Sequence, residues 1–335
     1  MVLEKEEGAR MRFRISDFGF RICLTLFLFP AIASADSSAL ILSGLPGSPA
    51  HAEKFAKWTE STRKILVEEL GFSPDRVLVL ADKKTTKADI EGAFKQLSKQ
   101  LKPDDAFFLF LIGHGSYDAD AGYKFQISGP DLTGADYSKL LLSLDTERIV
   151  IVNSTPASEG SFEALGGKGR VVIAAARARE ANDTVFYEHF LKGLEKAAGD
   201  EDKDKKVSVW EAFKYASASV ERFYKDQPNR LATEHPSLSD GGAKGVTAGV
   251  AEPPVIARTI SFHVDRPVTV ADARLQTLLN EKAALDKKIE TLRINRASMA
   301  AADYEKQLEE LVVQLALKNQ EIREREKQIQ GQGKQ

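Results

Sequence analysis

Short, continuously apolar stretches alternate with amphipathic ones along most of the chain. The apolar stretches are typical of parallel strands covered on both faces, because each is closed by turn-forming residues. They are residues 39–43, 76–81, 106–112, 148–153 and 170–175, with a shorter strand or hairpin arm at 123–128. Apolar residues at helical spacing predict helices over residues 51–70, 86–101, 136–144 and 181–198. We therefore expect an α/β fold, a three-layer sandwich with a mostly parallel sheet between layers of helices.

Two of these expected strands end in clusters of polar residues. Residues 106–112 run into Gly113-His114-Gly115, and the strand at 148–153 ends in Asn153-Ser154-Thr155. Ligands of open α/β sheets bind outside the carboxyl ends of the strands. His114 and the Asn153–Thr155 cluster are therefore expected to face one crevice. Neither a GxGxxG nor a GxxxxGK[ST] motif follows a strand, so dinucleotide and P-loop sites are not expected.

The N-terminal region has the features of a secretory signal. Residues 21–32 are mostly apolar, follow several arginines, and lead into the small residues Ala33-Ser34-Ala35. This pattern predicts residues 1–35 as a signal cut after Ala35, and hence a secreted or periplasmic protein. An uncleaved anchor is the alternative, but the stretch is shorter than the ~20 residues that span a membrane. Met11 is an alternative start, which would make residues 1–10 an upstream extension.

Cysteine usage limits the chemistry of the mature chain. Cys23 is the only cysteine and lies inside the expected signal, so the mature chain can form no disulfide and has no cysteine nucleophile. A formal net charge of −2 over 335 residues gives no reason to expect nucleic acid as a partner. No integral membrane segment is expected in the mature chain. His51, His189 and His263 lack partners at ligand spacing, and no HExxH zinc motif is present.

The C-terminal third differs in composition from the α/β region, which we place at residues 36–250. Residues 251–270 predict a linker or extended arm, with alternating apolar positions over 256–264. Residues 271–328 carry apolar side chains at 3–4 spacing, which predicts a coiled coil, either one long interrupted helix or a helical hairpin. Such a seam must pair with itself, with a second copy or with a protein partner. Residues 329–335 are expected to form a disordered tail.

One acidic segment has the spacing of a calcium-binding loop. Oxygen-bearing side chains occupy loop positions 1, 3, 5, 9 and 12 of an EF-hand pattern. They are Asp200, Asp202, Asp204, Ser208 and Glu211. Position 6, where the sharp turn favours glycine, is Lys205. Ser208 and Glu211 are equally explained as a capping box that opens a helix. Calcium is therefore a candidate ligand, and no other cofactor is expected.

The order of these motifs resembles the caspase-like fold shared by legumain, the caspases and the gingipains. The resemblance covers residues 39–250 and rests first on the strand that ends in His114-Gly115, followed by the strand that ends in Asn153. The remaining motifs that contribute are Gly160-Ser-Phe162, Gly169–Ala175 and Thr233-Glu-His-Pro236, and the stretch after the second strand is most similar to legumain. The resemblance implies a histidine general base at His114 and a cysteine nucleophile just after the second strand.

The chain departs from that pattern at the nucleophile. The cysteine position falls on Thr155 when counted from the strand and on Ala157 when counted back from Gly160, and neither residue has sulfur. A threonine hydroxyl needs a well-aligned base before it can attack, whereas a thiol is intrinsically nucleophilic. The hydroxyls of Ser154, Thr155 and Ser158 are also explained as partners of backbone groups in a tight loop, and His114 as a structural histidine.

Three functions are consistent with this pattern. The first is an exported, catalytically inactive pseudopeptidase that serves binding or scaffolding, with a coiled coil for association. The second is a hydrolase that uses a serine or threonine hydroxyl with His114. In the third, the coiled coil is the working part and the α/β domain is its platform.

Overall fold

A computed structural model describes residues 36–227, 229–264, 270 and 272–332 of the chain. The expected signal at residues 1–35 and the last residues of the expected tail lie outside the described residues. Among the described residues, no helix combines the length and the apolar character needed to cross a membrane.

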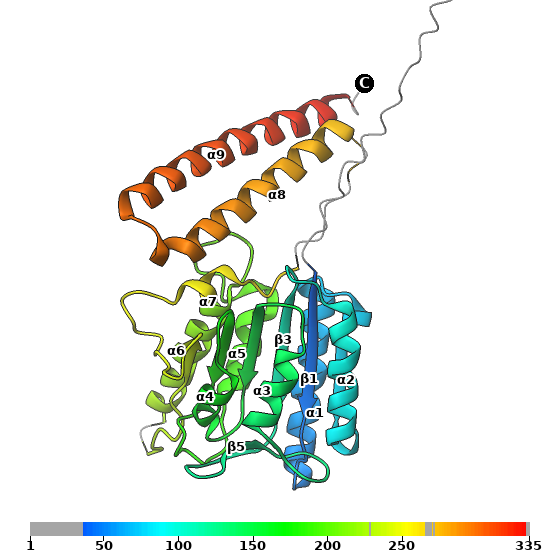
Figure 1. Cartoon of the computed structure of the whole chain (residues 1–335), viewed down its shortest axis with the longest axis vertical. Coiled ribbons are helices and arrows are strands. Elements are labelled where there is room, and N and C mark those ends of the chain that lie inside the picture. The colour runs from blue at the N-terminus through cyan, green and yellow to red at the C-terminus, as the bar shows by residue number, and fades with distance from the viewer. Residues whose placement is uncertain (1–35, 228, 265–269, 271, 333–335) are drawn as a thin grey trace, which may run out of the picture. The chain divides into compact units, whose positions relative to one another are not determined.

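A six-stranded sheet forms the centre of the α/β region, with strand order β2-β1-β3-β7-β8-β9 (Figure 1). The strands are β1 (Ser37–Ser43), β2 (Val77–Ala81), β3 (Ala106–Ile112), β7 (Arg148–Asn153), β8 (Arg170–Ala174) and β9 (Ser237–Asp240). The first five run parallel to one another, and β9 pairs antiparallel with β8. The mostly parallel sheet predicted from the sequence is thus confirmed.

Helices cover both faces of this sheet. On one face lie α1 (Pro49–Lys64), α5 (Phe186–Leu194) and α6 (Val209–Lys225), and on the other α2 (Lys87–Gln100), α3 (Gly134–Leu142) and α4 (Phe162–Leu165). Successive side chains of a strand point to opposite faces, so Phe108 and Phe110 pack with the first group, whereas Phe107 and Leu109 pack with the second. β3 is buried along its whole length for this reason.

A second, antiparallel sheet lies beside the carboxyl end of β3. It consists of β4 (Gly115–Asp118), β5 (Gly122–Phe125) and β6 (Leu132–Thr133), in the order β4-β5-β6. The expected arm at residues 123–128 is represented by β5, which gains partners on both sides. Tyr123 and Phe125 of β5 are buried, so this small sheet closes over the site end of the central sheet.

Three segments differ from the sequence expectation. α5 is shorter than the helix expected over 181–198, because the Glu234 carboxylate accepts the backbone N–H groups of Val185 and Phe186 at its start. Beyond its end, Lys196 and Ala197 adopt positive φ. Ser237–Asp240 forms the buried strand β9, which is not among the strands expected from the apolar pattern, and the arm expected over 251–270 contains helix α7 (Val255–Thr259). At Val255–Thr259 the extended alternative is wrong, since apolar residues four apart also suit a helix.

The C-terminal segment forms a helical hairpin of α8 (Ala273–Ile294) and α9 (Ala301–Gln332) (Figure 1). Among the described residues, ion pairs join the two helices, including Arg325 of α9 with Asp272, the N-cap of α8, at 2.6 Å and Lys318 with Glu281 at 2.7 Å. Leu275, Leu278 and Ile322 pack together between the helices. α9 continues to Gln332, so the helix enters the segment expected to be a disordered tail from residue 329.

Candidate functional site

The carboxyl ends of β3 and β7 bring the two polar clusters together. The strands are adjacent and parallel, with Leu111 paired to Asn153. Gly115 lies so close to β7 that a Cβ atom there would be 2.3 Å from Thr155 Oγ1 and 2.9 Å from Thr155 Cβ. His114 and the Asn153–Thr155 cluster therefore occupy one edge of the sheet.

Thr155, at the expected nucleophile position, is fully buried. Its Oγ1 donates to Asn153 Oδ1 at 2.9 Å and lies 2.8 Å from the Tyr123 hydroxyl and 3.0 Å from the Pro156 carbonyl oxygen. Burial raises the pKa of Tyr123 far above its ordinary value, so this phenol is protonated and cannot act as a base. The Thr155 hydroxyl is consequently a member of a closed structural network.

The neighbouring serines also have internal partners. Ser154 Oγ donates to the Leu111 carbonyl oxygen at 2.7 Å, which ties the loop after β7 to β3. Ser158 Oγ donates to the Ala176 carbonyl oxygen at 3.3 Å and accepts the Ala176 N–H at 3.1 Å. Both side chains are buried. These hydroxyls satisfy backbone groups, which is the usual role of serine in tight loops.

His114 bonds a backbone carbonyl oxygen rather than these hydroxyls. Its Nε2 lies 3.0 Å from the Pro46 carbonyl oxygen, and a carbonyl can only accept, so Nε2 carries the proton. The ring contacts Phe55 and His51 edge-on, with centroids 5.2 Å and 4.7 Å apart. Among the hydrogen bonds of the described residues, none joins His114 to Ser154, Thr155 or Ser158.

Ala157, the other position counted for the nucleophile, holds the loop in place through its backbone. Its φ is 54°, a left-handed conformation that is uncommon for residues other than glycine. Its N–H donates to the Glu180 carbonyl oxygen at 2.8 Å, and its side chain is buried. With no polar atom in the side chain, this position carries no reactive group.

A surface pocket of about 490 Å³ lies beside His114. Its lining comes from the loop after β1, from the carboxyl ends of β3 and β7, and from the loop before α5. The lining residues that bear reactive or polar side chains are Ser48, His51, His114, Gln126 and Asp183. The sheet edge therefore presents an open, polar pocket next to a closed hydroxyl network.

His51 and Asp183 form an ion pair in this pocket that the sequence analysis missed. His51 Nε2 lies 2.6 Å from Asp183 Oδ2, and His51 Nδ1 lies 3.0 Å from Ser48 Oγ. Burial opposes ionisation of Asp183, but the His51 hydrogen bond and the charge of Lys54 outweigh it and lower the pKa of this carboxyl. Asp183 is 132 residues from His51 in the sequence, so no local pattern indicates this pair. The Ser-x-x-His spacing at the start of α1 indicates only the contact between Ser48 and His51.

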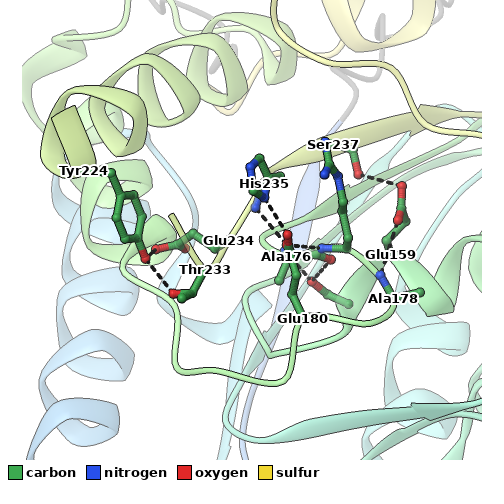
Figure 2. A network of polar contacts seen from close by, with 11 residues as sticks. Glu159, Ala176, Ala178, Glu180, Tyr224, Thr233, Glu234, His235 and Ser237 are labelled. Atoms are coloured by element: carbon green, nitrogen blue, oxygen red, sulfur yellow. Dashed lines mark hydrogen bonds and ion pairs between the residues drawn. The ribbon is translucent and has the colours of Figure 1, made fainter. Parts of the chain in front are cut away.

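A polar network of glutamates and His235 holds the loop that carries Asp183 (Figure 2). Glu180 accepts the His235 N–H at 2.9 Å and pairs with His235 Nδ1 at 2.5 Å. Glu234 is buried and accepts the N–H groups that open α5 together with the Tyr224 hydroxyl. Burial raises the pKa of Glu234 in spite of these donors. The Thr233-Glu-His-Pro236 motif therefore anchors β9 to the segment between β8 and α5.

The acidic loop brings together three of its five candidate metal ligands. Carboxylate oxygens of Asp200, Asp202 and Asp204 all lie within 4.8 Å of one another. Asp200 Oδ1 is buried without a hydrogen-bond partner. Lys205 adopts φ 72°, so it makes the left-handed turn that a glycine would favour at this position. Ser208 and Glu211 instead form the capping box of α6, with Ser208 Oγ donating to Glu211 Oε2 at 2.7 Å.

Comparisons with protein-family models and with curated proteins found no match. Among solved structures, the chain is similar to a protein from Geobacter sulfurreducens (TM-score 0.46, 15% identity, 68% of this chain and 99% of that chain). It is also similar to caspase-1 from Spodoptera frugiperda (TM-score 0.42, 10% identity, 64% and 92%). A third is the Drosophila initiator caspase Dronc (TM-score 0.39, 13% identity, 62% and 81%). These are similarities of fold, and they say nothing of activity, substrate or partner.

We predict that Gly115→Ala destabilises the protein by about 1–3 kcal/mol, because the added methyl group overlaps Thr155 in a packed interior. Gly92→Ala in α2 is the matched control. A Cβ there meets nothing within 4 Å, so it should stabilise by roughly 0.5–1 kcal/mol through helix propensity. Urea unfolding of both variants measures the difference. Equal stability of Gly115→Ala and the wild type would contradict the close packing of His114-Gly115 on Thr155.

Proposed function

We propose that the chain is an exported caspase-like module without peptidase activity, whose pocket beside His114 binds a ligand and whose C-terminal hairpin mediates association. The single observation that carries this proposal is the closed network around Thr155. Thr155, one of the two positions counted for the nucleophile, is fully buried, and its hydroxyl is bonded to Tyr123, Asn153 and Pro156.

The position of the base supports the same conclusion. A general base must reach the proton that it removes, directly or through one water. His114 Nε2 donates to the Pro46 carbonyl oxygen, so only Nδ1 could act as the base, and among the described residues no hydrogen bond joins His114 to Ser154, Thr155 or Ser158. Replacing the nucleophile of a triad-type site leaves only the residual effect of binding and oxyanion stabilisation. Peptide hydrolysis through Thr155 and His114 is therefore disfavoured, because the Thr155 hydroxyl is bonded within its own network and not to His114.

The pocket itself supports a binding role. It remains open beside the closed hydroxyl network, with a volume of about 490 Å³. Ligand sites typically combine a concave shape with a few polar groups that fix orientation. Here His114, His51 and Asp183 supply such groups, and Pro46 and Pro156 supply apolar contact. A binding module retains these features without needing a nucleophile.

Peptide turnover tests this proposal. We expect the purified mature chain to hydrolyse no member of a peptide library, and His114→Ala to leave that result unchanged. Retention of the fold is checked by circular dichroism. Turnover by the wild type that disappears in both His114→Ala and Thr155→Ala would overturn the inactive assignment and support the Ser/Thr hydrolase instead.

A second proposed function is calcium binding by the loop at Asp200–Glu211, and one specific observation favours it. Asp200 Oδ1 is buried and has no hydrogen-bond partner, beside carboxylates of Asp202 and Asp204. Calcium takes six to eight oxygen ligands, so these carboxylates would be completed by backbone carbonyls and water. The engagement of Glu211 in the capping box and the adjacent Lys205 and Lys206 favour a weak site.

We predict that calcium binds with a dissociation constant of roughly 10⁻⁴–10⁻³ M, the range of weak modules, and that Asp200→Asn abolishes binding. Burial and the neighbouring carboxylates raise the pKa of Asp202. Protons therefore compete with calcium for this carboxylate, and calcium affinity should fall as the pH is lowered. Calorimetric titration of chelator-treated protein measures both effects, with Asp226→Asn as the charge-matched control. Absence of heat at millimolar calcium would reject the site.

Association through the hairpin is supported by apolar residues that the two helices leave exposed. On α9, Val312, Val313 and Leu317 are 47%, 53% and 57% exposed. Neighbouring turns of a helix bring residues four apart onto one face, so Val313 and Leu317 lie on one stripe. A second copy of the hairpin would cover this stripe with the same residues.

We predict that the chain is a dimer in solution and that the double change Val313→Glu with Leu317→Glu makes it a monomer. Light scattering after size-exclusion chromatography measures the mass. Leu231→Glu serves as the control, because Leu231 is 85% exposed and lies outside the hairpin. A wild-type mass equal to that of one chain would contradict self-association.

A further inference from the structure

We propose that Ser48, His51 and Asp183 form a catalytic site in the pocket beside His114, in which the Ser48 hydroxyl accepts an acyl group from a small carboxylic ester. This site is separate from the hydroxyl network around Thr155. Nothing in this inference depends on the peptidase resemblance, since none of the three residues belongs to the motifs that carry it. The observation behind it is a continuous chain of contacts: Ser48 Oγ to His51 Nδ1 at 3.0 Å and His51 Nε2 to Asp183 Oδ2 at 2.6 Å.

The hydrogen bond to Asp183 sets the tautomer of neutral His51. A carboxylate oxygen only accepts, so the proton of neutral His51 resides on Nε2, facing Asp183. Nδ1 then presents its lone pair to the Ser48 hydroxyl, which donates to it. In this arrangement Ser48 is the nucleophile, His51 is the base beside it, and Asp183 is the third group that orients the base. Asp183 also stabilises the imidazolium that forms when His51 takes a proton.

Ser48 has a structural role that is compatible with this chemistry. It is the N-cap of α1, and its Oγ accepts the His51 backbone N–H at 3.2 Å. That bond uses an oxygen lone pair and leaves the hydroxyl proton for His51 Nδ1. The cap therefore holds the Ser48 side chain in position against the base, in contrast to the hydroxyls of Thr155 and Ser158, which are buried.

The start of α1 supplies a stabilising environment for negative charge. The first backbone N–H groups of a helix have no acceptor within the helix, and the helix dipole favours an anion there. In α1, Pro49 has no N–H and the His51 N–H is taken by Ser48, so the Ala50 N–H is the donor beside the nucleophile. Ala50 is exposed to solvent, and in this proposal the developing oxyanion lies against its N–H.

The reaction balances with water as the only co-reactant. Ser48 Oγ attacks the ester carbonyl carbon while its proton passes to His51 Nδ1, and the carbonyl oxygen becomes the oxyanion. Collapse breaks the bond to the alkoxide leaving group, which takes the proton from His51. Water, deprotonated by His51, then attacks the acyl-serine and releases the carboxylic acid, with the proton returning to Ser48.

The pocket favours a small ester as the substrate class. Its volume of about 490 Å³ accommodates a compact acyl group, and Pro46, Pro156 and Ala181 provide apolar contacts. Esters have better leaving groups than amides and depend less on a large oxyanion hole. A single helix N-terminus beside Ser48 therefore suits ester cleavage.

Labelling with a fluorophosphonate probe tests the proposal, since such probes bond covalently to activated serine hydroxyls. We expect one adduct, located by mass spectrometry on the peptide that contains Ser48, together with hydrolysis of p-nitrophenyl acetate. Ser48→Asn should abolish both while keeping the cap, because asparagine is a good N-cap residue. His51→Gln keeps Ser48 and should slow labelling by roughly 10²–10⁴-fold. Ser143→Asn, at an exposed serine, is the matched control and should change neither.

Two results would overturn the inference. The first is absence of an adduct on Ser48 in folded wild-type protein, with folding verified by its thermal transition. The second is an adduct whose rate His51→Gln leaves unchanged, since the serine would then not be activated by the histidine. Neither result bears on peptide turnover through Thr155, so this inference and the proposed function fail separately.

Discussion

The parallel pairing of β3 with β7 is the constraint on which the site depends. β3 is buried on both faces, so its polar continuation can leave the core only at its carboxyl end. There Gly113-His114-Gly115 meets the loop that follows β7, and the absence of a side chain at Gly115 lets the two segments touch. The same contact that brings His114 to the crevice also seals Thr155 beneath it. One packing interaction thus creates the pocket and removes the hydroxyl from it.

The position of Asp183 in the pocket depends on contacts between segments far apart in the sequence rather than on the sheet. Asp183 lies in a loop between β8 and α5, and this loop is held by Glu180 against His235 and by Glu234 at the start of α5 (Figure 2). With the loop held in this way, Asp183 pairs with His51 at the start of α1. The pocket is therefore lined by segments that are far apart in the sequence, and the loop that carries Asp183 is fixed by polar contacts of its own.

The sequence predicts the central sheet well because a buried parallel strand is encoded locally, as a continuous apolar run closed by turn residues. It also predicts that His114 and Asn153–Thr155 share an edge, since parallel strands end together. It does not predict which hydroxyls are free. Tyr123, which belongs to the small sheet, bonds to Thr155 and closes it off. The pairing of that sheet is not visible in the apolar pattern. The His51–Asp183 pair joins distant positions, so no local spacing indicates it.

The anchoring of α5 by Glu234 has a consequence for the order in which the chain folds. The two N–H groups at the start of this helix are satisfied by a carboxylate 48 and 49 residues further along the chain. Closing such a loop costs chain entropy before any contact is gained. The beginning of α5 is therefore completed only when the segment around β9 docks on β8. This makes the start of α5 a part of the native state that forms late, together with the docking of β9.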